Sequence, residues 1–489
     1  MDLIIAIDQG TTSTKAHLIN QKAEIIYTAR KSISLITPKD GWVEQDPDEI
    51  LNSVIFCIKD VYHKALKLNC NILTIGLTNQ RETTLIWHKK TGKVIYNAIS
   101  WQDSRTGNEL KSLTKKEQDY ITEITGLVPS PYFSASKIKW LITHKLKNKN
   151  LENYALGTID SFIIYHLTGK KTHATDTSNA SRTMLFDLRK LDFDAKLLKM
   201  FHVKHCMLPQ VKNSMDHYGT LCPSILGEEL AISSVIGDQQ AATIGHCCFN
   251  EADAKATFGT GCFIMVNTGK KIHKSEAKLL TTILYSKKNE VFYALEGSVF
   301  YAGSALNWAK DKLELYSDFA HAEKEVAQLE DNGGVYLVPA LSGLGAPYWQ
   351  DKARGVIIGL SHNTSKAHLL RATFEAIAYQ THDLCAALKQ EGFGLDSLNI
   401  DGGIASNNWF NQFLCEILAK EVYKPYNLEL TSMGAAYLAG LQTGFFTSFA
   451  ELRKLHKIEQ KYTHNKISEK TRKKYISSWK TAISFAIKA

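Results

Sequence analysis

The stretch Leu3-Ile4-Ile5-Ala6-Ile7-Asp8-Gln9-Gly10-Thr11-Thr12-Ser13 decides the fold. Leu3–Ile7 is a continuous apolar run rich in β-branched residues, which is typical of a buried strand. Gly10 permits a sharp turn, and Ala16–Ile19 then resumes a strand-like pattern. We therefore predict a strand–turn–strand unit whose tip is the polar segment Asp8–Ser13.

A second unit of the same kind lies about 245 residues further along the chain. Ala256-Thr257-Phe258 leads into Gly259-Thr260-Gly261, and the apolar run Cys262–Val266 follows. The similarity in letters is faint, but the order of strand, Gly/Thr turn and strand is repeated. This repeat predicts two domains of like construction that face each other across a cleft.

Strand and helix patterns alternate between these units. Ile50–Leu68 has apolar residues at helical spacing, and Ile72–Leu77 follows as a short buried strand. Such alternation predicts α/β layers. Because a single core stops growing at ~250–300 residues, 489 residues call for more than one domain. We place the boundary near Cys248 to Asp253, which gives domains of residues 1–249 and 250–489.

The net charge of +9 is concentrated at one end of the sequence. Residues 451–489 contain 11 Lys and Arg against 3 Asp and Glu, so the preceding part is close to neutral at +1. A whole-surface footprint for nucleic acid is therefore absent. Tyr475, Ile476, Trp479, Ile483, Phe485 and Ile487 predict instead a docking helix with a lysine-rich solvated face.

Composition excludes several other classes. Hydrophobic residues make up 44% and charged residues 22%, as in globular proteins. Nine scattered cysteines without a Cys-x-x-Cys pair favour reduced, mostly buried thiols over a disulfide scaffold or a zinc ribbon. We find no secretory signal pattern and no stretch of ~18 apolar residues, so we expect a cytoplasmic protein without membrane spans.

The turn Asp8–Ser13 could bind phosphate. Its hydroxyls and exposed backbone amides suit phosphate oxygens, and an Asp at a strand end can hold Mg²⁺ through water. An ordinary hairpin turn is about equally compatible with this segment alone. The second Gly/Thr turn at Gly259-Thr260-Gly261 favours the phosphate interpretation. P-loop and dinucleotide-binding motifs are absent from the sequence.

Asp238 is a candidate general base. It follows the short apolar run that ends at Ile236-Gly237, and small residues after it predict a helix. In phosphoryl transfer, an Asp in such a position can accept the proton of the substrate hydroxyl. A purely structural N-cap Asp fits the same letters, so both interpretations stay open.

Asn79-Gln80-Arg81-Glu82 places an amide, a cation and an anion at the end of a strand. These groups can match the hydroxyls of a small polyol, although a solvated Arg–Glu pair is the more common outcome. Trp101–Thr106 and Pro131-Tyr132-Phe133 are more often core and turn than site. They could nonetheless provide an apolar wall for a short carbon backbone.

Together these motifs resemble the FGGY carbohydrate kinase family of the actin-like ATPase superfamily, and within it the glycerol-phosphorylating members. The resemblance runs over nearly the whole chain. The combination of Asn79–Thr84 with Gly237–Gln240 is its most specific part. The remaining matches are Asp8–Ser13, Gly41–Glu44, Tyr96–Ile99, Trp101–Thr106, Asn179–Phe186, Gly259–Phe263, Gly343–Trp349 and Asp401–Asn408.

The resemblance implies an α/β fold of two actin-like (ribonuclease H-like) domains facing across a nucleotide- and substrate-binding cleft. It implies phosphorylation of glycerol to sn-glycerol 3-phosphate by direct in-line transfer from ATP, with Mg²⁺ and with Asp238 as general base. Glycerol would be held by Arg81, Glu82, Tyr132, Asp238 and Gln239, with Trp101 and Phe263 against its carbons. The ATP residues would be Thr11, Thr12, Ser13, Lys15, Thr260, Gly303, Asn307, Gly403 and Asn407, and the metal ligands Asp8 and Asp238. A homodimer or homotetramer is also implied.

At three places the sequence departs from the family pattern, which qualifies the assignment of the family's residue roles to this chain. Asn307 stands where a glutamine is common, and Lys15 stands where an arginine is common near the transferred phosphate. Lysine keeps the charge but loses the bidentate fork of arginine. Residues 218–234 lack the Gly-Gly-Thr-Arg-type loop that binds fructose 1,6-bisphosphate in some members. We therefore expect no inhibition by that sugar phosphate.

Three alternatives remain. The acceptor could be another small polyol or a ketose, because pocket size cannot be read from one dimension. The protein could be an actin-like assembly or chaperone ATPase, although the Arg81–Glu82 polyol set would then be unexplained. A binding protein for RNA or anionic membranes would rest on the C-terminal charge alone.

Overall fold

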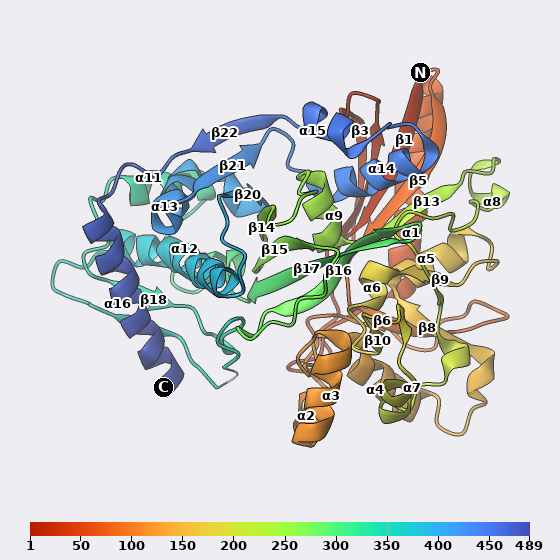
Figure 1. Ribbon diagram of the computed structural model, residues 1–489, viewed down its shortest axis with the longest axis horizontal. Coiled ribbons are helices and arrows are strands. Elements are labelled where there is room, and N and C mark those ends of the chain that lie inside the picture. The colour runs from red at the N-terminus through yellow and green to blue at the C-terminus, as the bar shows by residue number, and fades with distance from the viewer. Residues whose placement is uncertain (351) are drawn as a thin grey trace.

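The computed structural model describes residues 1–350 and 352–489, and its core is a pair of mixed β-sheets, one in each half of the chain (Figure 1). The N-terminal sheet has the order β13-β5-β1-β2-β3. Strands β1 (Asp2–Gln9), β2 (Ser13–Ile19) and β3 (Ile25–Ser32) form an antiparallel meander. Strands β5 (Asn71–Asn79) and β13 (Ile232–Gly237) add in parallel on the β1 side.

The C-terminal sheet repeats this plan. Its order is β16-β17-β15-β14-β20-β21-β22. Here β14 (Ala254–Phe258), β15 (Cys262–Gly269) and β17 (Glu290–Val299) are antiparallel, while β20 (Ser397–Asp401) and β21 (Glu421–Pro425) add in parallel. Strands β16 (Leu280–Lys287) and β22 (Ile458–Tyr462) extend the two edges. The predicted α/β fold with two ribonuclease H-like halves is confirmed.

The first helix shows why the local sequence folds as predicted. Helix α1 (Pro47–Lys67) begins three residues before the predicted range, because the side chain of Asp46 accepts a hydrogen bond from the backbone of Asp48. Pro47 at the first helical position needs no amide donor. The apolar residues then repeat on one face and pack against β1, β2 and β3.

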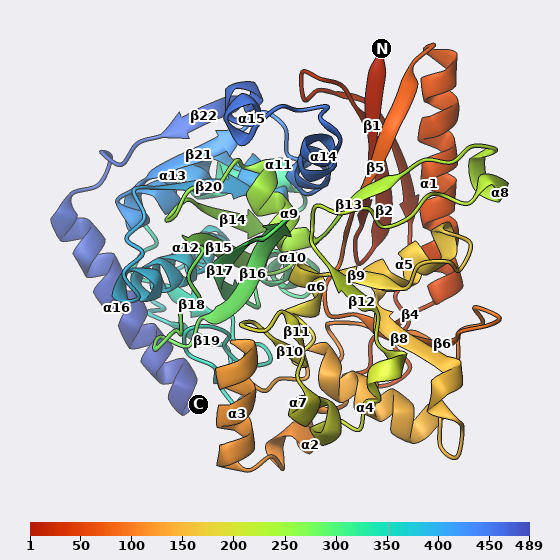
Figure 2. The same cartoon turned by 45° about the vertical axis from the view of Figure 1, so that its right-hand side comes forward.

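Helix α14 (Leu430–Thr443) belongs to the C-terminal half by sequence but covers the other face of the N-terminal sheet (Figure 2). It packs against α9 (Asp238–Gly245) and against β1, β5 and β13. The contact depends on glycine. A Cβ on Gly434 would lie 1.9 Å from the carbonyl oxygen of Ala241, and one on Gly76 would lie 2.5 Å from that of Ala435. Small residues therefore allow α14 to pack closely against both α9 and β5.

The other elements surround these two sheets. In the N-terminal half, a four-stranded sheet of order β4-β7-β6-β8 is formed by Glu44–Gln45, Ala98–Ile99, Thr84–His88 and Tyr154–Thr158. Two short strand pairs join β9 (Ala174–Asp176) to β12 (Gln210–Lys212), and β10 (Phe186–Asp187) to β11 (Asp192–Phe193). The helices are α2 (Gly107–Lys111), α3 (Lys115–Thr125), α4 (Ser134–Lys145), α5 (Ile159–Leu167), α6 (Thr177–Ala180), α7 (Ala195–Met200) and α8 (Pro223–Leu226), with 3₁₀ turns η1 (Leu151–Asn153) and η2 (His205–Met207).

In the C-terminal half, β18 (Tyr336–Val338) pairs with β19 (Val356–Ile358). The helices are α10 (Gly303–Asp311), α11 (Phe319–Ala327), α12 (Lys366–Gln390), α13 (Asn408–Leu418), α15 (Phe449–Leu455) and α16 (Glu469–Lys488), with the 3₁₀ turn η3 (Gly403–Ser406). No helix of the described residues is long and apolar enough to cross a membrane. All nine cysteines are free thiols.

The basic C-terminal helix α16 docks on the C-terminal half (Figure 1). Its Trp479 is fully buried, stacks on Tyr379 of α12 and donates from Nε1 to Asp383 at 2.7 Å. The predicted docking helix is confirmed, but its predicted apolar face was too wide. Phe485 and Ile487 are 52% and 40% exposed, because α16 presents Ala482, Ile483 and Ala486 to the core over its last turns.

Candidate active site

The first turn follows β1 and carries charge. Asp8 lies near the end of β1 and pairs across the hairpin with Lys15 of β2. The pKa of the Asp8 carboxyl is raised to about 7, chiefly by burial and then by the charge of Asp238, against the opposing effect of Lys15. Lys15 is in turn held by Glu429, with Nζ and Oε1 2.6 Å apart. Glu429 immediately precedes α14, so the C-terminal half helps to position a cation of the first turn.

Of the three hydroxyls in this turn, only that of Thr11 is engaged in a hydrogen bond among the described residues. The backbone amide of Gly10 donates to the carbonyl of Ser13 at 2.9 Å. The hydroxyl of Thr11 accepts from Nε1 of Trp101 at 2.9 Å, which ties the turn to an aromatic side chain. Thr12 is exposed. Among the described residues, no hydrogen bond joins the side chains of Asp8 or Thr12 to the backbone of the turn, unlike in the ordinary hairpin alternative.

The second turn follows β14 and relies on backbone groups. The amide of Gly259 donates to the carbonyl of Gly261 at 2.9 Å, and Thr260 is exposed like Thr12. The start of α10 donates two amides to the carbonyl of Thr260. A Cβ on Gly303 would lie 2.6 Å from the carbonyl oxygen of Gly259, so only glycine allows this approach. The second turn and α10 therefore form one packed unit.

The four predicted adenosine residues lie on two segments that follow the second turn. Gly303 opens α10, and Asn307 is exposed one helical turn later. Gly403 opens η3, beside β14, and has open space around it. The side chain of Asn407 is fully buried, and its Oδ1 accepts from the amide of Phe410 at 2.8 Å as the N-cap of α13. Asn407 therefore has a structural role that the sequence analysis did not assign to it.

Asp238 opens α9 but does not cap it. The N-cap position is Gly237, and Asp238 is the first helical residue, so the N-cap alternative is wrong. Its Oδ1 accepts from its neighbour's amide, that of Gln239, at 2.7 Å and lies 3.2 Å from Nε of Arg81. The side chain is 28% exposed. Burial raises the pKa of Asp238 above its usual range, and the charge of Arg81 limits the increase.

Arg81 and Glu82 are buried, so the alternative of a solvated pair is wrong as well. Their side chains are each 2% exposed. Glu82 adopts a φ of 61°, an uncommon left-handed conformation for a residue without special turn propensity. Such backbone strain persists only where the surroundings impose it, and it clusters at functional sites. Here the side chain of Glu82 is held by Arg182, whose Nε lies 2.7 Å from Oε1 of Glu82.

Two residues of this cluster were missed by the sequence analysis, Arg182 and Glu296. Glu296 on β17 lies 2.6 Å from Nη1 of Arg81 and 2.9 Å from Nη2 of Arg182. Although burial alone would raise it, these two guanidinium groups lower the pKa of Glu296 to about 2. A signal existed in the sequence, since a glutamate interrupts the otherwise apolar and small run from Ala294 to Val299.

The predicted aromatic residues do meet. The ring of Trp101 lies 5.8 Å from that of Tyr132 and 6.4 Å from that of Phe263, both in edge-on geometry. Tyr132 and Phe263 come from opposite halves of the chain. The fully buried Lys137 donates from Nζ to the carbonyl of Tyr132 at 2.8 Å, and burial lowers its pKa to about 7. The sequence analysis did not single out this lysine.

Asp8 and Asp238 are the residues predicted to hold a metal. In residues 1–350 and 352–489 no group of three or more His, Cys, Asp or Glu side chains is arranged as a metal site. The two carboxylates are nonetheless near enough for the charge of Asp238 to raise the pKa of Asp8. Mg²⁺ typically keeps several waters and takes one or two carboxylates together with substrate phosphates. The pair fits that requirement, because a cation would relieve its repulsion.

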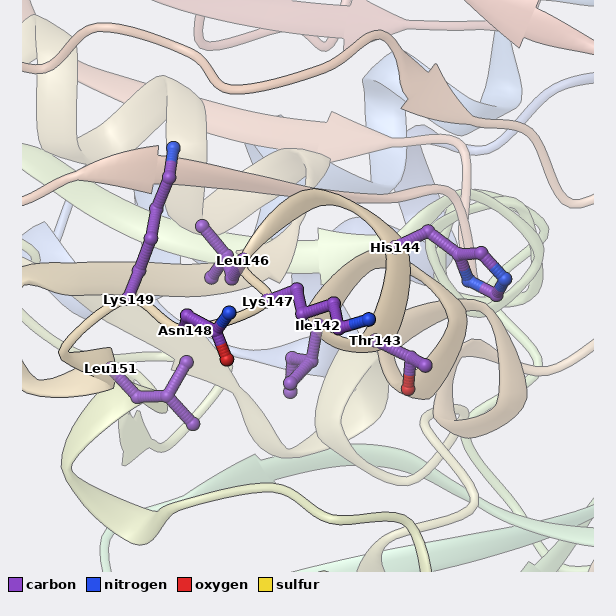
Figure 3. A pocket seen from close by; sticks show the side chains of 8 residues that line it. All are labelled: Ile142, Thr143, His144, Leu146, Lys147, Asn148, Lys149 and Leu151. Carbon is purple, nitrogen blue, oxygen red and sulfur yellow. The ribbon is translucent and has the colours of Figure 1, made fainter.

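A hollow of about 630 Å³ lies elsewhere, over residues 142–144, 146–149 and 151 (Figure 3). It sits at the C-terminal end of α4 and the loop beyond, whereas Tyr132 precedes the start of that helix. Twelve residues of helix span roughly 18 Å. None of the predicted site residues lines this hollow, so it is not part of the candidate site.

The fold and the site define the class of protein. Two ribonuclease H-like halves, each with an exposed threonine on a strand–turn–strand unit, together with a base at a helix start, are typical of actin-like phosphotransferases. Residues 3–245 match the N-terminal domain of the FGGY family of carbohydrate kinases, and residues 254–443 match its C-terminal domain. The chain belongs to this family, as the resemblance in the sequence indicated.

Individual relatives agree with this assignment. The glycerol kinase of Halothermothrix orenii is 44% identical over 99% of this chain and 98% of its own length. That of Alteromonas mediterranea is 42% identical over 98% of each chain. A crystal structure of Plasmodium falciparum glycerol kinase with ADP superposes with a TM-score of 0.92 at 35% identity, covering 99% of this chain and 98% of the other. A ligand-bound xylulose kinase from Lactobacillus acidophilus, with a TM-score of 0.86 and 22% identity, shares the fold alone.

Proposed function

We propose that the protein is an enzyme that transfers the γ-phosphate of ATP to glycerol and forms sn-glycerol 3-phosphate. The observation that carries this proposal is the buried ion cluster of Asp238, Arg81, Glu82 and Arg182. The guanidinium of Arg182 lies 5.7 Å from the ring centroid of Tyr132, which contacts Trp101 and through it Phe263 of the other half. Such a set suits a short, fully hydroxylated carbon chain. The glycerol kinases that are similar over nearly their whole length support the same substrate.

Asp238 is the proposed general base. Its Oδ1 is engaged by Arg81 and by the amide of Gln239, while no hydrogen bond among the described residues engages Oδ2. Oδ2 can therefore accept the proton of the attacking terminal hydroxyl. A raised pKa makes the carboxylate a stronger base, while the charge of Arg81 favours its ionised form. Arg81, Glu82, Tyr132 and Gln239 bind the hydroxyls, and Trp101 and Phe263 exclude water from the carbon chain.

The two turns would bind the nucleotide. Thr12 and Thr260 are exposed in the two halves and suit phosphate oxygens, with Thr11, Ser13 and Lys15 beside the first. Gly303, Asn307, Gly403 and Asn407 would line the adenosine. Asp8 and Asp238 would hold Mg²⁺, which when bound neutralises the charge of the transferring phosphate. We keep residues 1–249 and 250–489 as the two domains of this site.

An acceptor panel tests the proposal. ADP release is measured with glycerol, dihydroxyacetone, erythritol, xylulose and no acceptor at fixed Mg²⁺–ATP. We expect the highest kcat/KM with glycerol, and little turnover without an acceptor. Preference for erythritol or xylulose would assign the enzyme to another polyol or ketose, and acceptor-independent turnover would favour an assembly or chaperone ATPase. Either result contradicts the proposal.

A single substitution tests the base. Asp238→Asn keeps the shape of the side chain but removes the proton acceptor, so we expect kcat to fall by about 10²–10⁴-fold. ATP affinity, measured by calorimetry, should remain measurable. Asp318→Asn is the matched control, because Asp318 is an exposed N-cap of α11 and asparagine caps a helix equally well. Near-normal turnover of Asp238→Asn would remove this residue as the base.

Fructose 1,6-bisphosphate should not regulate the enzyme. Residues 218–234 lack the loop that binds it in some family members, and they form instead the short helix α8 between two bridged segments. Initial rates with increasing concentrations of this sugar phosphate check the expectation. A dose-dependent loss of activity would contradict it.

A further inference from the structure

Lys255 is a buried lysine beside the candidate site to which neither the sequence nor the proposed chemistry assigns a role. It lies on β14 of the C-terminal half and is fully buried. Its Nζ donates to Oε1 of Gln239 at 2.6 Å and to Oγ1 of Thr257 at 2.8 Å. Gln239 belongs to α9 of the other half, so this lysine links the two halves at a proposed substrate contact.

The lysine fixes the orientation of the Gln239 amide. An ammonium group has three donors and no acceptor, so the amide atom that faces it must be the oxygen. This assignment follows from chemistry and holds even though amide oxygen and nitrogen are otherwise hard to tell apart. The –NH₂ group must then point away from Lys255. Among the described residues no acceptor engages this –NH₂ group, and Gln239 is partly exposed beside Asp238.

A purely structural reason for Lys255 is weak. Burial disfavours its charged form and lowers its pKa, although the carboxylates of Asp401, Glu296 and Asp238 offset part of this cost. The equivalent strand position in the first hairpin, four residues before its glycine, is Ala6. A small apolar residue therefore satisfies this hairpin geometry. The second hairpin instead carries a lysine that requires three nearby carboxylates.

We propose that Lys255 is a positioning residue for the polyol: by holding Oε1 of Gln239, it makes the amide of Gln239 present only N–H donors to an acceptor hydroxyl. The inference rests on the proposed function and deepens it. Glycerol oxygens accept hydrogen bonds from such donors, whereas an amide free to rotate would expose its oxygen for part of the time. The lysine touches no substrate in this arrangement and acts through Gln239.

The test combines Lys255→Met, Gln239→Leu and the double variant in the full-length enzyme. Methionine has a similar length and no donor. We expect Lys255→Met to raise the KM for glycerol about tenfold, as for one lost hydrogen bond to a correctly oriented partner. The KM for ATP and the Tm should change little. Because Lys255 acts only through Gln239, the double variant should be no worse than Gln239→Leu alone.

The matched control is Lys424→Met. Lys424 lies on β21 of the same sheet and is almost as buried as Lys255. Its Nζ lies 2.9 Å from Oε2 of Glu459, and neither residue belongs to the predicted site. It should leave the KM for glycerol unchanged. Where Lys255→Met does not fold, Lys255→Gln keeps a shorter donor and should give a smaller increase in the same KM. Equal rises in the KM for glycerol and for ATP, or additive effects in the double variant, would overturn the proposal.

Failure of the inference and failure of the proposed function give different results. If the wild-type enzyme turns over glycerol and Lys255→Met keeps its KM, only the inference fails. If the wild type prefers another acceptor, the same variants are measured with that acceptor, and an unchanged KM again overturns the inference. If turnover needs no acceptor at all, both fail together.

Discussion

The two hairpin turns have the same topology but present different chemistry. Counting back two residues from the turn glycine gives Asp8 in the first hairpin and Thr257 in the second. Across each hairpin, Asp8 pairs with Lys15, whereas Thr257 pairs with Phe263. The first turn therefore carries two opposite charges, Asp8 and Lys15, and its lysine pairs with Glu429 of the other half. The second carries a hydroxyl and an aromatic ring.

In the second half, the carboxylate lies on the parallel neighbour strand and not on the hairpin itself. Beside Asp8 lies Thr78 on β5, and beside Thr257 lies Asp401 on β20. Burial would raise the pKa of Asp401, but a hydrogen bond from His246 at 2.5 Å lowers it below its usual value. Asp401 of the second half thus has a hydrogen-bond partner that stabilises its ionised form, whereas burial destabilises the ionised form of Asp8 in the first half. The two copies share the backbone arrangement of the hairpin and its parallel neighbour strand, but they carry the carboxylate on different strands.

Among the substitutions that test this comparison of the two turns, one in the charged first turn should have the largest effect. Asp8→Asn removes the carboxylate that would hold Mg²⁺ while keeping the size of the side chain. We expect kcat/KM for Mg²⁺–ATP to fall by about 10²–10³-fold, the usual cost of losing a preorganised electrostatic group. Steady-state kinetics at several Mg²⁺ concentrations measure this loss. The same exchange at the second copy, Asp401→Asn, should not change the dependence on Mg²⁺, and a shared change would remove the contrast between the turns.

Asp8→Asn should also be more stable than the wild type, and the gain in stability should depend on pH. The folded-state pKa of Asp8 is about 7 against an ordinary value of 3.8, so folding disfavours its ionised form. This cost is absent below the ordinary pKa and is fully present above the raised one. Asp8→Asn should therefore gain Tm at about pH 8 and gain less at about pH 5.5. Calorimetry without nucleotide checks this, and a gain that grew on acidification would contradict it.

The second turn, at Gly259–Gly261, should be sensitive to added side-chain volume where it packs against α10. In Gly303→Ala, the new Cβ would lie 2.6 Å from the carbonyl of Gly259 and would push the second turn away from α10. We expect a loss of about 1–3 kcal/mol in stability, as for other overpacked sites. The KM for ATP should rise more than that for glycerol. Gly334→Ala at φ 80°, with open space around it, is a control for backbone strain alone.

The smallest expected effect is that of Lys15→Arg. Arginine would restore a bidentate fork towards phosphate, but Glu429 already holds the cation at this position at 2.6 Å. Because a fork can pair with Glu429 and still keep a free N–H, the KM for ATP should fall by no more than about threefold. A larger gain would show that Lys15 limits nucleotide binding. Glu429→Gln, which frees the lysine, gives the comparison.

Much of the fold could be predicted from local pattern. Leu3–Ile7, Ile72–Leu77 and Ala256–Phe258 became strands, because apolar β-branched runs bounded by turns have few other solutions. The repeat of strand, turn and strand predicted two like halves. Five strands of the C-terminal sheet, β21-β20-β14-β15-β17, follow the same plan as the N-terminal order β13-β5-β1-β2-β3. Local pattern could not predict that α14, the helix around Gly434, covers the sheet of the other half.

The candidate site could be predicted only in part. Motif residues such as Arg81, Asp238 and Trp101 were named. The structure brings Arg81 to Asp238, and Trp101 to Thr11 of the first turn. Arg182, Lys137, Lys255 and Glu296 were not named, although Arg182 lies within the matching segment Asn179–Phe186 and Glu296 interrupts an apolar run. Their importance arises from long-range pairs, such as Arg81 with Glu296, which are 215 residues apart in sequence.

The sequence by itself thus determined the strands, the two turns, the family and the residue types that carry the chemistry. These depend on interactions between near neighbours, which a linear pattern records. Only the tertiary structure decided the raised pKa of Asp8, the contact of the Gln239 amide with Lys255, and the ion pair of Lys15 with Glu429. Burial and pairing set those properties, and both are created when segments such as β5, β17 and α9 meet.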